Sequence, residues 1–196
     1  MTHLHYDHLM GLLHFSSFPT GARLRFFSCF DNWFGQDSLR RFLSPPYWPY
    51  TPDFGDLCSL SPPASITLEH GITADFRRSI HPDGCMLVSL RFQGKRVCFA
   101  WDYEHGSISL DDWARGCDLL LYDGTYTPEE YGQHRGWGHS TWQEGCRLAA
   151  RIGVARLLIS HHSPDADDGV LRRAEQEAKS VFPHAHFARE CEVISL

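Results

Sequence analysis

Short apolar runs separated by turn residues recur along most of the chain, and this spacing is typical of β-strands. The runs predict strands over 24–30, 65–69, 72–80, 86–92, 97–101, 119–122 and 157–160. Because Gln93, Gly94 and Lys95 lie between two of these runs, the runs on either side are expected to pair as a hairpin.

Two later segments show the helical period. A helix is expected to begin at Thr141, because Thr141 and Glu144 form a T-x-x-E capping box, and to end at Gly153. A second helix is expected over 168–181, and a helical turn over 110–114. The inward positions of the second helix are predicted to be Val170, Leu171, Ala174, Ala178 and Val181. Hairpins mixed with helices indicate a layered α+β domain.

The segment 45–63 differs from its surroundings, because it carries six prolines among several aromatic residues. Proline removes a backbone donor and fixes the backbone, so a regular helix or a central strand is excluded there. The segment is predicted to be a loop or lid that is packed by its own rings.

Length and charge narrow the class of protein. The 196 residues suit one domain, predicted over 1–196. A net charge of −6 without a basic run argues against nucleic acid as a partner. No apolar stretch approaches the roughly 20 residues of a membrane span, and no secretory signal opens the chain. We therefore expect no membrane contact and a cytoplasmic location, where seven scattered cysteines would be buried thiols.

Histidine is the exception in this composition, because several of the 13 histidines cluster with aspartate. The sequence HLHYDH places His3 and His5 on one side of an extended segment, directly before Asp7 and His8. Imidazole and carboxylate groups suit Zn, Fe, Mn or Co, and a turn at the D-H pair would serve a second ion. A surface cluster that binds metal opportunistically is the alternative interpretation.

The segment H-x-H-x-D-H resembles the signature of the metallo-β-lactamase superfamily. Matching positions follow in order: His81 in IHPDG, Asp102 after CFAW, His139 in GWGHSTW and His161 in LLISHHSP. The segments DLLLYDGTYTPEEY, GWGHSTW and PPYWPY resemble a cyclic-phosphate phosphodiesterase branch, which is more distantly related to RNase Z. The resemblance implies an αββα four-layer sandwich of the metallo-β-lactamase type.

The resemblance also implies two divalent metal ions about 3.5–4 Å apart. The ligands of the first ion would be His3, His5 and His81. The ligands of the second ion would be Asp7, His8 and His161, with Asp102 bridging both ions. Zinc is the expected metal, with manganese or iron as alternatives.

The same resemblance implies a catalytic role for two residues. His139 matches the histidine of a GHST motif, and it would stabilise developing charge or protonate the leaving oxygen. A polar residue near a helix cap is the alternative interpretation of His139. Asp7 would orient or deprotonate the water between the ions.

Several neighbouring residues keep two interpretations each. Asp123 ends a strand, and it either accepts a hydrogen bond from a ligand imidazole or caps a turn. His162 is either a group that supports the site or contacts substrate, or an ordinary packed or solvated histidine. Four rings would form one wall of a substrate pocket or belong to the core: Tyr126, Tyr131, Trp137 and Trp142.

The chain departs from the family pattern at its start, where only Met1 precedes Thr2 and the ligand motif. Metallo-β-lactamase domains usually carry several strands before this motif, so the chain is predicted to be truncated at the N-terminus. Three explanations compete: an upstream start, which we favour; a strand borrowed from a partner subunit, as in a homodimer; and a degraded relative. In each case fraying of the first residues would weaken metal binding.

The leading functional hypothesis is a metal-dependent hydrolase, namely a di-metal phosphodiesterase acting on a small cyclic or diester phosphate. An RNase Z-like nuclease is the alternative enzyme, disfavoured by the acidic charge and the lack of a basic, glycine-rich arm. A thioester or lactam hydrolase fits less well, because GHST favours phosphate. A non-catalytic, truncated remnant would bind metal without turnover.

Overall fold

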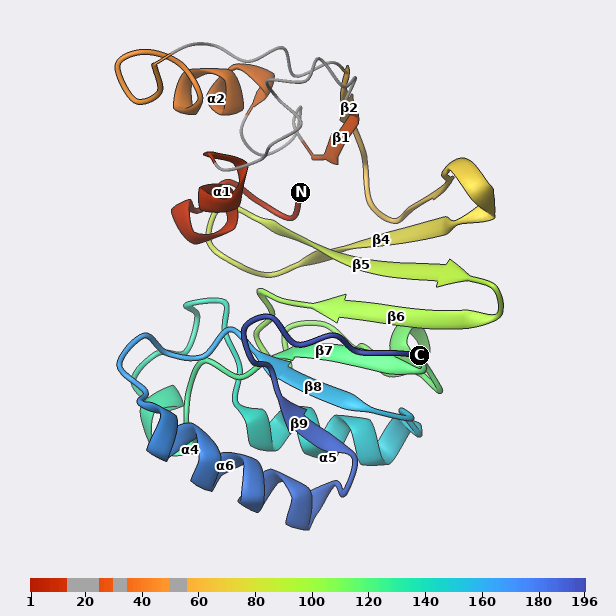
Figure 1. Ribbon diagram of the computed structural model, residues 1–196, viewed down its shortest axis with the longest axis vertical. Coiled ribbons are helices and arrows are strands. Elements are labelled where there is room, and N and C mark those ends of the chain that lie inside the picture. Colours follow the sequence, from red (N-terminus) through yellow and green to blue (C-terminus); the bar gives the residue numbers. More distant parts are fainter. Residues whose placement is uncertain (14–24, 30–34, 50–55) are drawn as a thin grey trace. The chain divides into compact units, whose positions relative to one another are not determined.

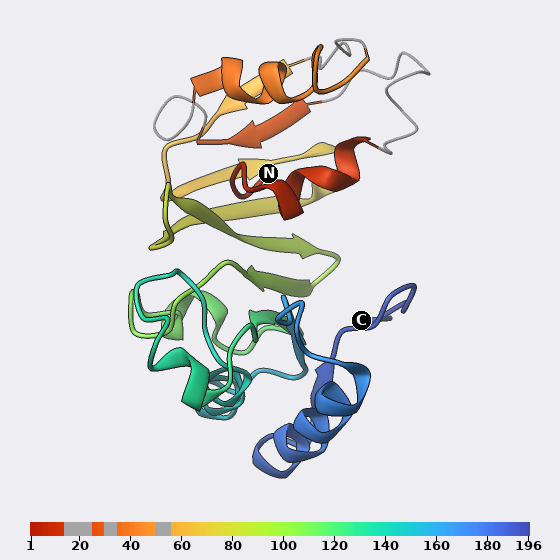
Figure 2. The same ribbon diagram turned by 90° about the vertical axis from the view of Figure 1, so that its left-hand side faces the viewer.

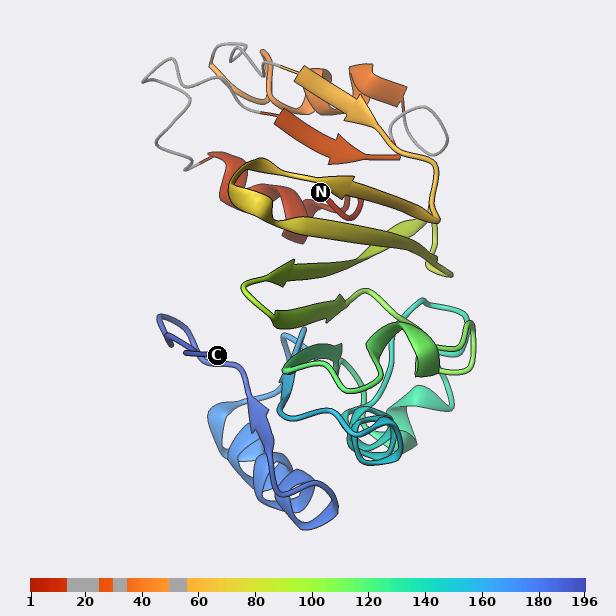
Figure 3. The same cartoon turned by 90° about the vertical axis from the view of Figure 1, so that its right-hand side faces the viewer.

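The computed structural model describes residues 1–13, 25–29, 35–49 and 56–196, which form two compact units, Met1–Ala64 and Ser65–Leu196. The described elements of the first unit are α1 (Tyr6–Leu13), β1 (Arg25–Ser28), α2 (Gly35–Phe42) and β2 (Asp56–Ser59). Strands β1 and β2 pair in parallel and lie side by side in Figure 3. Leu9 of α1 is buried with Leu39 and Leu43, so an apolar cluster joins α1 to the α2 segment.

The first residues of this unit are anchored. The Met1 ammonium donates a hydrogen bond to the carbonyl oxygen of Phe27 over 2.8 Å. Met1 and Leu4 also pack against the cluster around Leu9. These contacts hold the first residues of the unit, and the expected weakening of metal binding stays a prediction.

The second unit is built on a seven-stranded sheet with the order β3-β4-β5-β6-β7-β8-β9. The strands are β3 (Ala64–Thr67), β4 (Thr73–Ser79), β5 (Cys85–Phe92), β6 (Lys95–Ala100), β7 (Leu119–Asp123), β8 (Leu157–Ser160) and β9 (Ala185–Phe187). Strands β4, β5 and β6 pair antiparallel, whereas β6 to β9 pair in parallel. The carboxyl ends of β6, β7 and β8 therefore meet at one edge, on the left of Figure 1.

Helices α3 (Asp111–Ala114), α5 (Trp142–Ile152) and α6 (Asp168–Val181) contribute buried residues to the core on one face of this sheet. Helix α4 (Pro128–Tyr131) and the short turn η2 (Glu69–Gly71) contribute none. Cys146 of α5 and Ala178 of α6 belong to the same buried cluster as Tyr122 and Ile159 of the sheet. Figures 1 and 2 show α5 and α6 on the same side of the strands β7 to β9.

Most predicted elements of the second unit are confirmed. The hairpin turns at Gln93 and Gly94, which both have positive φ angles. Thr141 caps α5 by accepting the Glu144 N–H over 3.3 Å, and Gly153 ends the helix with a φ angle of 69°. Helix α6 has the predicted bounds.

The predicted inward face of α6 is partly wrong. Val170 and Val181 are 39% and 47% exposed, while the charged residue Glu175 is buried at 4%. Glu175 can be buried because Lys179 and Arg189 reach its carboxylate at 2.9 and 2.6 Å. The packed face of the helix is therefore rotated away from the two valines.

The prediction for the proline-rich segment is also partly wrong. Residues 56–59 form the parallel strand β2, although 45–63 was predicted to be a loop. The paired residues follow the last proline before the strand, so no missing donor interrupts the ladder. Residues 50–55, and with them part of the proposed lid, lie outside the described residues.

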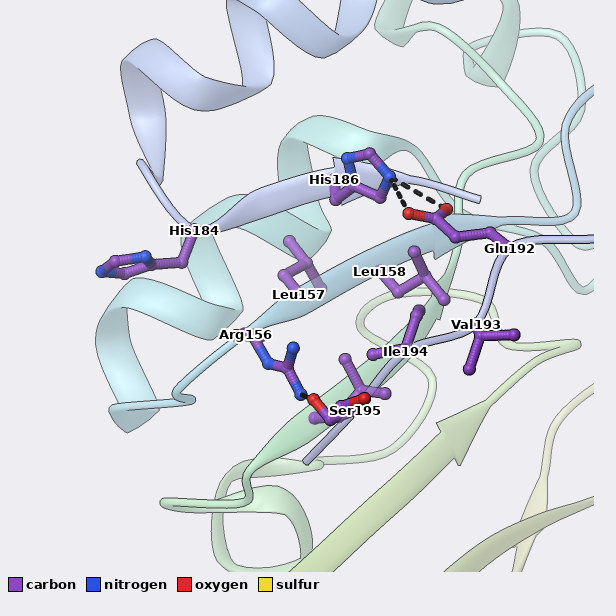
Figure 4. A pocket seen from close by; sticks show the side chains of 10 residues that line it. Arg156, Leu157, Leu158, His184, His186, Glu192, Val193, Ile194 and Ser195 are labelled. Carbon is purple, nitrogen blue, oxygen red and sulfur yellow. Dashed lines mark hydrogen bonds and ion pairs between the residues drawn. The ribbon is translucent and has the colours of Figure 1, made fainter. Parts of the chain in front are cut away.

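The C-terminal residues return to the sheet of the second unit. The Arg156 side chain donates to the carbonyl oxygen of Ser195 over 2.6 Å. His186 donates to the carboxylate of Glu192 at 2.9 and 3.0 Å, and Figure 4 draws both interactions. All seven cysteines are free thiols, and five of them are buried. Among the described helices, none has both the length and the apolarity to cross a bilayer.

Candidate metal centre

Four of the predicted site residues meet at the edge where the strands of the second unit end. His81 follows β4, Asp102 follows β6 and His161 follows β8. His139 precedes α5, and its ring lies 5.1 Å from the ring of His81 and 4.8 Å from that of His161. The topology of the sheet thus gathers side chains that are up to 80 positions apart in the sequence.

Asp102 lies between two histidines and is buried. Its Oδ2 lies 3.4 Å from Nε2 of His81, and its Oδ1 lies 3.1 Å from Nε2 of His161. Each carboxylate oxygen therefore faces a different imidazole. This is the arrangement that a carboxylate bridging two ligand sets requires.

The other ring nitrogen of each histidine is already engaged. Nδ1 of His81 donates to the carbonyl oxygen of Gly138 over 3.3 Å, and Nδ1 of His161 lies 2.9 Å from Oγ1 of Thr125. With Nδ1 as the donor, a neutral ring directs the lone pair of Nε2 toward Asp102. A proton on Nε2 or a cation between the groups removes the repulsion between that lone pair and the carboxylate, and imidazoles around a shared carboxylate are donors that zinc and similar ions accept. The donor set therefore fits a divalent metal ion.

Asp123 holds His139. The buried carboxylate accepts a hydrogen bond from Nδ1 of His139 over 2.9 Å through Oδ2, which leaves Nε2 of His139 directed away from Asp123. Its Oδ1 accepts from the Ser140 N–H over 3.2 Å and from the Thr125 hydroxyl over 2.8 Å. Both oxygens are occupied, so Asp123 is better placed to orient His139 than to bind metal. The contacts support both interpretations of Asp123, because Oδ2 accepts from an imidazole while Oδ1 also accepts from the Thr125 N–H over 3.1 Å, as in an aspartate-centred turn.

The backbone at His161 is unusual. Its φ angle is 58°, in the left-handed region that residues other than glycine seldom adopt. The Thr125 hydroxyl also lies 2.8 Å from the His161 carbonyl oxygen, so its one proton is shared between that oxygen and Oδ1 of Asp123. Strain of this kind persists where the surroundings over-determine the conformation, and it clusters at functional sites.

The loop before His139 is fastened by Glu104. The Glu104 carboxylate accepts from the Gly136 N–H at 2.8 and 3.0 Å and from the Gly138 N–H at 3.0 Å. The hydroxyl of Tyr131 donates to it as well, over 2.9 Å. Burial works to raise the pKa of Glu104, but these donors together hold that pKa below its ordinary value.

Ser140 of the GHST motif is fully buried. Its hydroxyl lies 2.9 Å from the Tyr122 hydroxyl and 2.8 Å from Nδ1 of His105. Burial lowers the pKa of His105 and raises that of Tyr122, so both groups are neutral near pH 7. The contacts are those of a packed hydrogen-bond network that supports the segment carrying His139.

The remaining predicted ligands gather within the first unit. The ring of His3 is buried, 4.4 Å from that of His5 and 4.3 Å from that of His8. Oγ1 of Thr2 lies 3.2 Å from Nδ1 of His3. Helix α1 begins directly after His5, so Asp7 and His8 occupy its first turn, with Nε2 of His8 3.3 Å from the Asp7 carboxylate. The turn expected at Asp7 and His8 is therefore the first turn of a helix. That these residues bind the same pair of metal ions as His81, Asp102 and His161 stays a prediction.

The sequence analysis missed two residues that support the group of His81, Asp102, His139 and His161. Thr125 links His161 to Asp123, and Glu104 fastens the loop of Gly136 and Gly138. A threonine two positions after Asp123 was a weak signal of an aspartate-centred turn. Nothing in the sequence marked Glu104, because its partners are backbone amides more than 30 positions away.

Comparison with known proteins supplies further findings. Residues 1–162 match a family model described as a β-lactamase superfamily domain. A curated protein of Gemmatimonas aurantiaca named ribonuclease Z is 34% identical over 116 residues, which cover 58% of this chain and 36% of that protein. The first three curated relatives are matched over 33–40% of their length, so the chain spans well under half of them.

Solved structures share the fold. The metallo-β-lactamase fold protein YhfI of Bacillus subtilis matches with a TM-score of 0.72 at 22% identity, covering 96% of this chain and 72% of that one. The short form of human tRNase Z matches with 0.71 at 18% identity, covering 100% and 77%. A diphosphatase of the PhnP family matches with 0.62 at 19% identity, covering 96% and 66%. The expected metallo-β-lactamase fold is thereby confirmed.

One expectation about partners needs correction. The net charge of −6 predicts little contact with nucleic acid, yet a relative at 34% identity is named ribonuclease Z. Net charge is a property of the whole surface, whereas contact with a phosphate depends on local donors and cations. The charge of this chain therefore does not exclude a nucleic-acid substrate.

Proposed function

Because this chain belongs to the β-lactamase superfamily, among hydrolases of the metallo-β-lactamase fold, we propose that it is a di-metal phosphodiesterase acting on a small cyclic or diester phosphate. The observation that supports the proposal is the buried Asp102 with an imidazole Nε2 at each of its oxygens. Two cations held by a shared carboxylate can contact the attacking and the leaving oxygen of a phosphodiester together.

The proposed ligands are those that the family resemblance assigns. His3, His5 and His81 would hold one ion; Asp7, His8 and His161 would hold the other; Asp102 would bridge them. Zinc is the proposed metal, since nitrogen-rich donor sets with carboxylates suit it. When bound, the two ions would supply a water of lowered pKa and Lewis-acid contacts to the phosphate oxygens.

His139 is the proposed proton donor to the leaving oxygen. Asp123 accepts from its Nδ1, and this contact stabilises the protonated ring and directs Nε2 outward. Helix α5 begins three residues later, and the positive end of its dipole favours a nearby anion. Asp7, at the start of α1, would orient the attacking water.

An RNase Z-like nuclease is the second candidate function. The observation in its favour is the 34% identity to a protein named ribonuclease Z. Both candidates use the same ligands and differ in the size of the phosphodiester. A cytoplasmic location is proposed from the seven free thiols, while a single domain over 1–196 and self-association as a homodimer stay predictions.

Metal content and hydrolysis together test the proposal. We expect about two ions per purified chain by elemental mass spectrometry, and hydrolysis of bis(p-nitrophenyl) phosphate. His81→Ala should lower both, whereas His184→Ala, which removes an exposed histidine outside the cluster, should change neither. A metal-loaded chain that cleaves neither this diester nor an RNA oligonucleotide would refute the phosphodiesterase and favour the non-catalytic remnant.

A further inference from the structure

A row of aromatic rings leads from the candidate centre to the surface of the second unit. The ring of Tyr126 lies 5.9 Å from that of His139 and stacks on His134 at 4.5 Å with an interplanar angle of 14°. The ring of Trp137 meets His134 edge-on at 4.8 Å, and 58% of Trp137 is exposed. We call Tyr126, His134 and Trp137 the aromatic platform.

The exposed tryptophan sits on a fastened backbone. Glu104 accepts hydrogen bonds from the N–H groups of Gly136 and Gly138, the residues on either side of Trp137. The Trp137 N–H itself donates to the carbonyl oxygen of His134 over 3.1 Å. Exposing a large indole sacrifices the stabilisation that its burial would bring. An exposed ring on a held backbone suits stacking against a ligand, because little backbone freedom remains to be lost on binding.

The charge around the platform is mixed. Arg135 is exposed, and its guanidinium lies 5.6 Å from the ring centre of Tyr131. Glu129 and Glu130 of α4 are exposed nearby in the sequence and oppose that positive charge. Charges of both signs do not form the continuous positive surface that binds a long polyanion. This arrangement does allow one flat, neutral ring to stack on Trp137.

We propose that the aromatic platform binds a nucleobase attached to the reacting phosphate, and so selects phosphodiesters that carry a base over those that carry only aliphatic groups. This inference rests on the proposed phosphodiesterase function and names the substrate feature that the same site recognises. The row of rings supports it, because the ring of Tyr126 neighbours both His139 of the candidate centre and His134 of the platform. Aromatic side chains next to single-stranded nucleotides commonly bind bases by stacking, with little preference among bases.

Two phosphate ligands that differ only in the base test this proposal. Adenosine 5′-monophosphate and ribose 5-phosphate share the phosphate and the sugar. Isothermal titration calorimetry on the metal-loaded full chain would give both dissociation constants, and their ratio reports the base alone. Trp137→Ala should reduce the preference for the nucleotide about 5- to 150-fold, the range found when base-stacking rings are replaced by alanine.

Two further variants keep the test decisive. Trp137→Phe should retain much of the preference, because phenylalanine can still stack. Phe92→Ala removes an exposed aromatic at the β5–β6 turn, at the opposite end of β6 from Asp102, and should leave the ratio as in the wild type. An unchanged ratio in Trp137→Ala, or no preference for the nucleotide in the wild type, would overturn the inference. If the wild type shows the ratio but cleaves no phosphodiester, the proposed function fails instead.

Discussion

The close approach of Gly138 to His81 makes a sharp prediction about glycine. A Cβ added to Gly138 would lie 2.0 Å from Nδ1 of His81 and 2.9 Å from its Cα. A Cβ added to Gly136 would meet nothing within 4 Å, although both glycines have a φ angle of +86°. Replacing each glycine by alanine therefore separates the cost of the backbone conformation from the cost of displacing His81.

The magnitudes follow from these distances. The left-handed backbone costs a residue with a Cβ about 1–2 kcal/mol, and both variants bear it. Gly138→Ala also overpacks a buried ring, which typically costs a further 1–3 kcal/mol or so. We expect Gly136→Ala to lose roughly 1–2 kcal/mol of unfolding free energy and Gly138→Ala about 2–5 kcal/mol.

Urea unfolding followed by fluorescence would measure the two free energies, and competition with a chelator would measure zinc affinity. Because His81 is a proposed ligand, Gly138→Ala should weaken zinc binding, whereas Gly136→Ala should bind zinc almost as the wild type does. Equal stability losses and equal zinc affinities in the two variants would refute the proposed contact between Gly138 and His81.

Three further predictions concern the groups around the centre. Thr125→Val should weaken metal binding about 10- to 100-fold, because His161 loses its Nδ1 partner, whereas Thr125→Ser should retain affinity in the same chelator assay. The pKa of Glu104 is lowered in the folded chain, so its contribution to stability is present above the ordinary glutamate pKa and lost as pH falls through the folded value. The protection of the loop amides against hydrogen exchange, relative to their intrinsic rate at each pH, should therefore fall as the Glu104 carboxylate is protonated, and in Glu104→Gln this pH dependence should be absent. Thr141→Ala should cost about 0.5–2 kcal/mol by thermal unfolding, since α5 loses its cap, and an unchanged midpoint would contradict that role.

The elements that were predictable from the sequence share one property: their signals are local. Helix α6 has the predicted bounds because apolar residues recur along it at helical spacing, although its packed face differs from the predicted one. Helix α5 begins after Thr141 because the cap lies three residues from its partner. Helix α1 was missed because residues 6–13 overlap the ligand motif, whose histidines and aspartate mask the apolar period. Strand β9 was missed because three residues, Ala185–Phe187, are too few to show a period.

In the candidate site, too, the features with local signals were predictable and the others were not. His81, Asp102, His139 and His161 could be named from motifs, because each lies beside a recognisable strand end or helix start. The roles of the carboxylates could not be read from the sequence. Asp102 and Asp123 both follow apolar strands, and only the contacts distinguish a group that faces two imidazoles from one that orients His139.

The sequence by itself determined most strands and the two long helices of the second unit, the family resemblance, and the side chains that are proposed to bind metal. These are properties of neighbouring residues, and local periodicity and motif spacing encode them. The tertiary structure alone decided which residues hold those side chains in place, namely Thr125, Asp123, Glu104 and Gly138. Their partners lie 16 to 57 positions away or on the backbone, so the pairing arises only when the parallel strands bring their carboxyl ends to one edge.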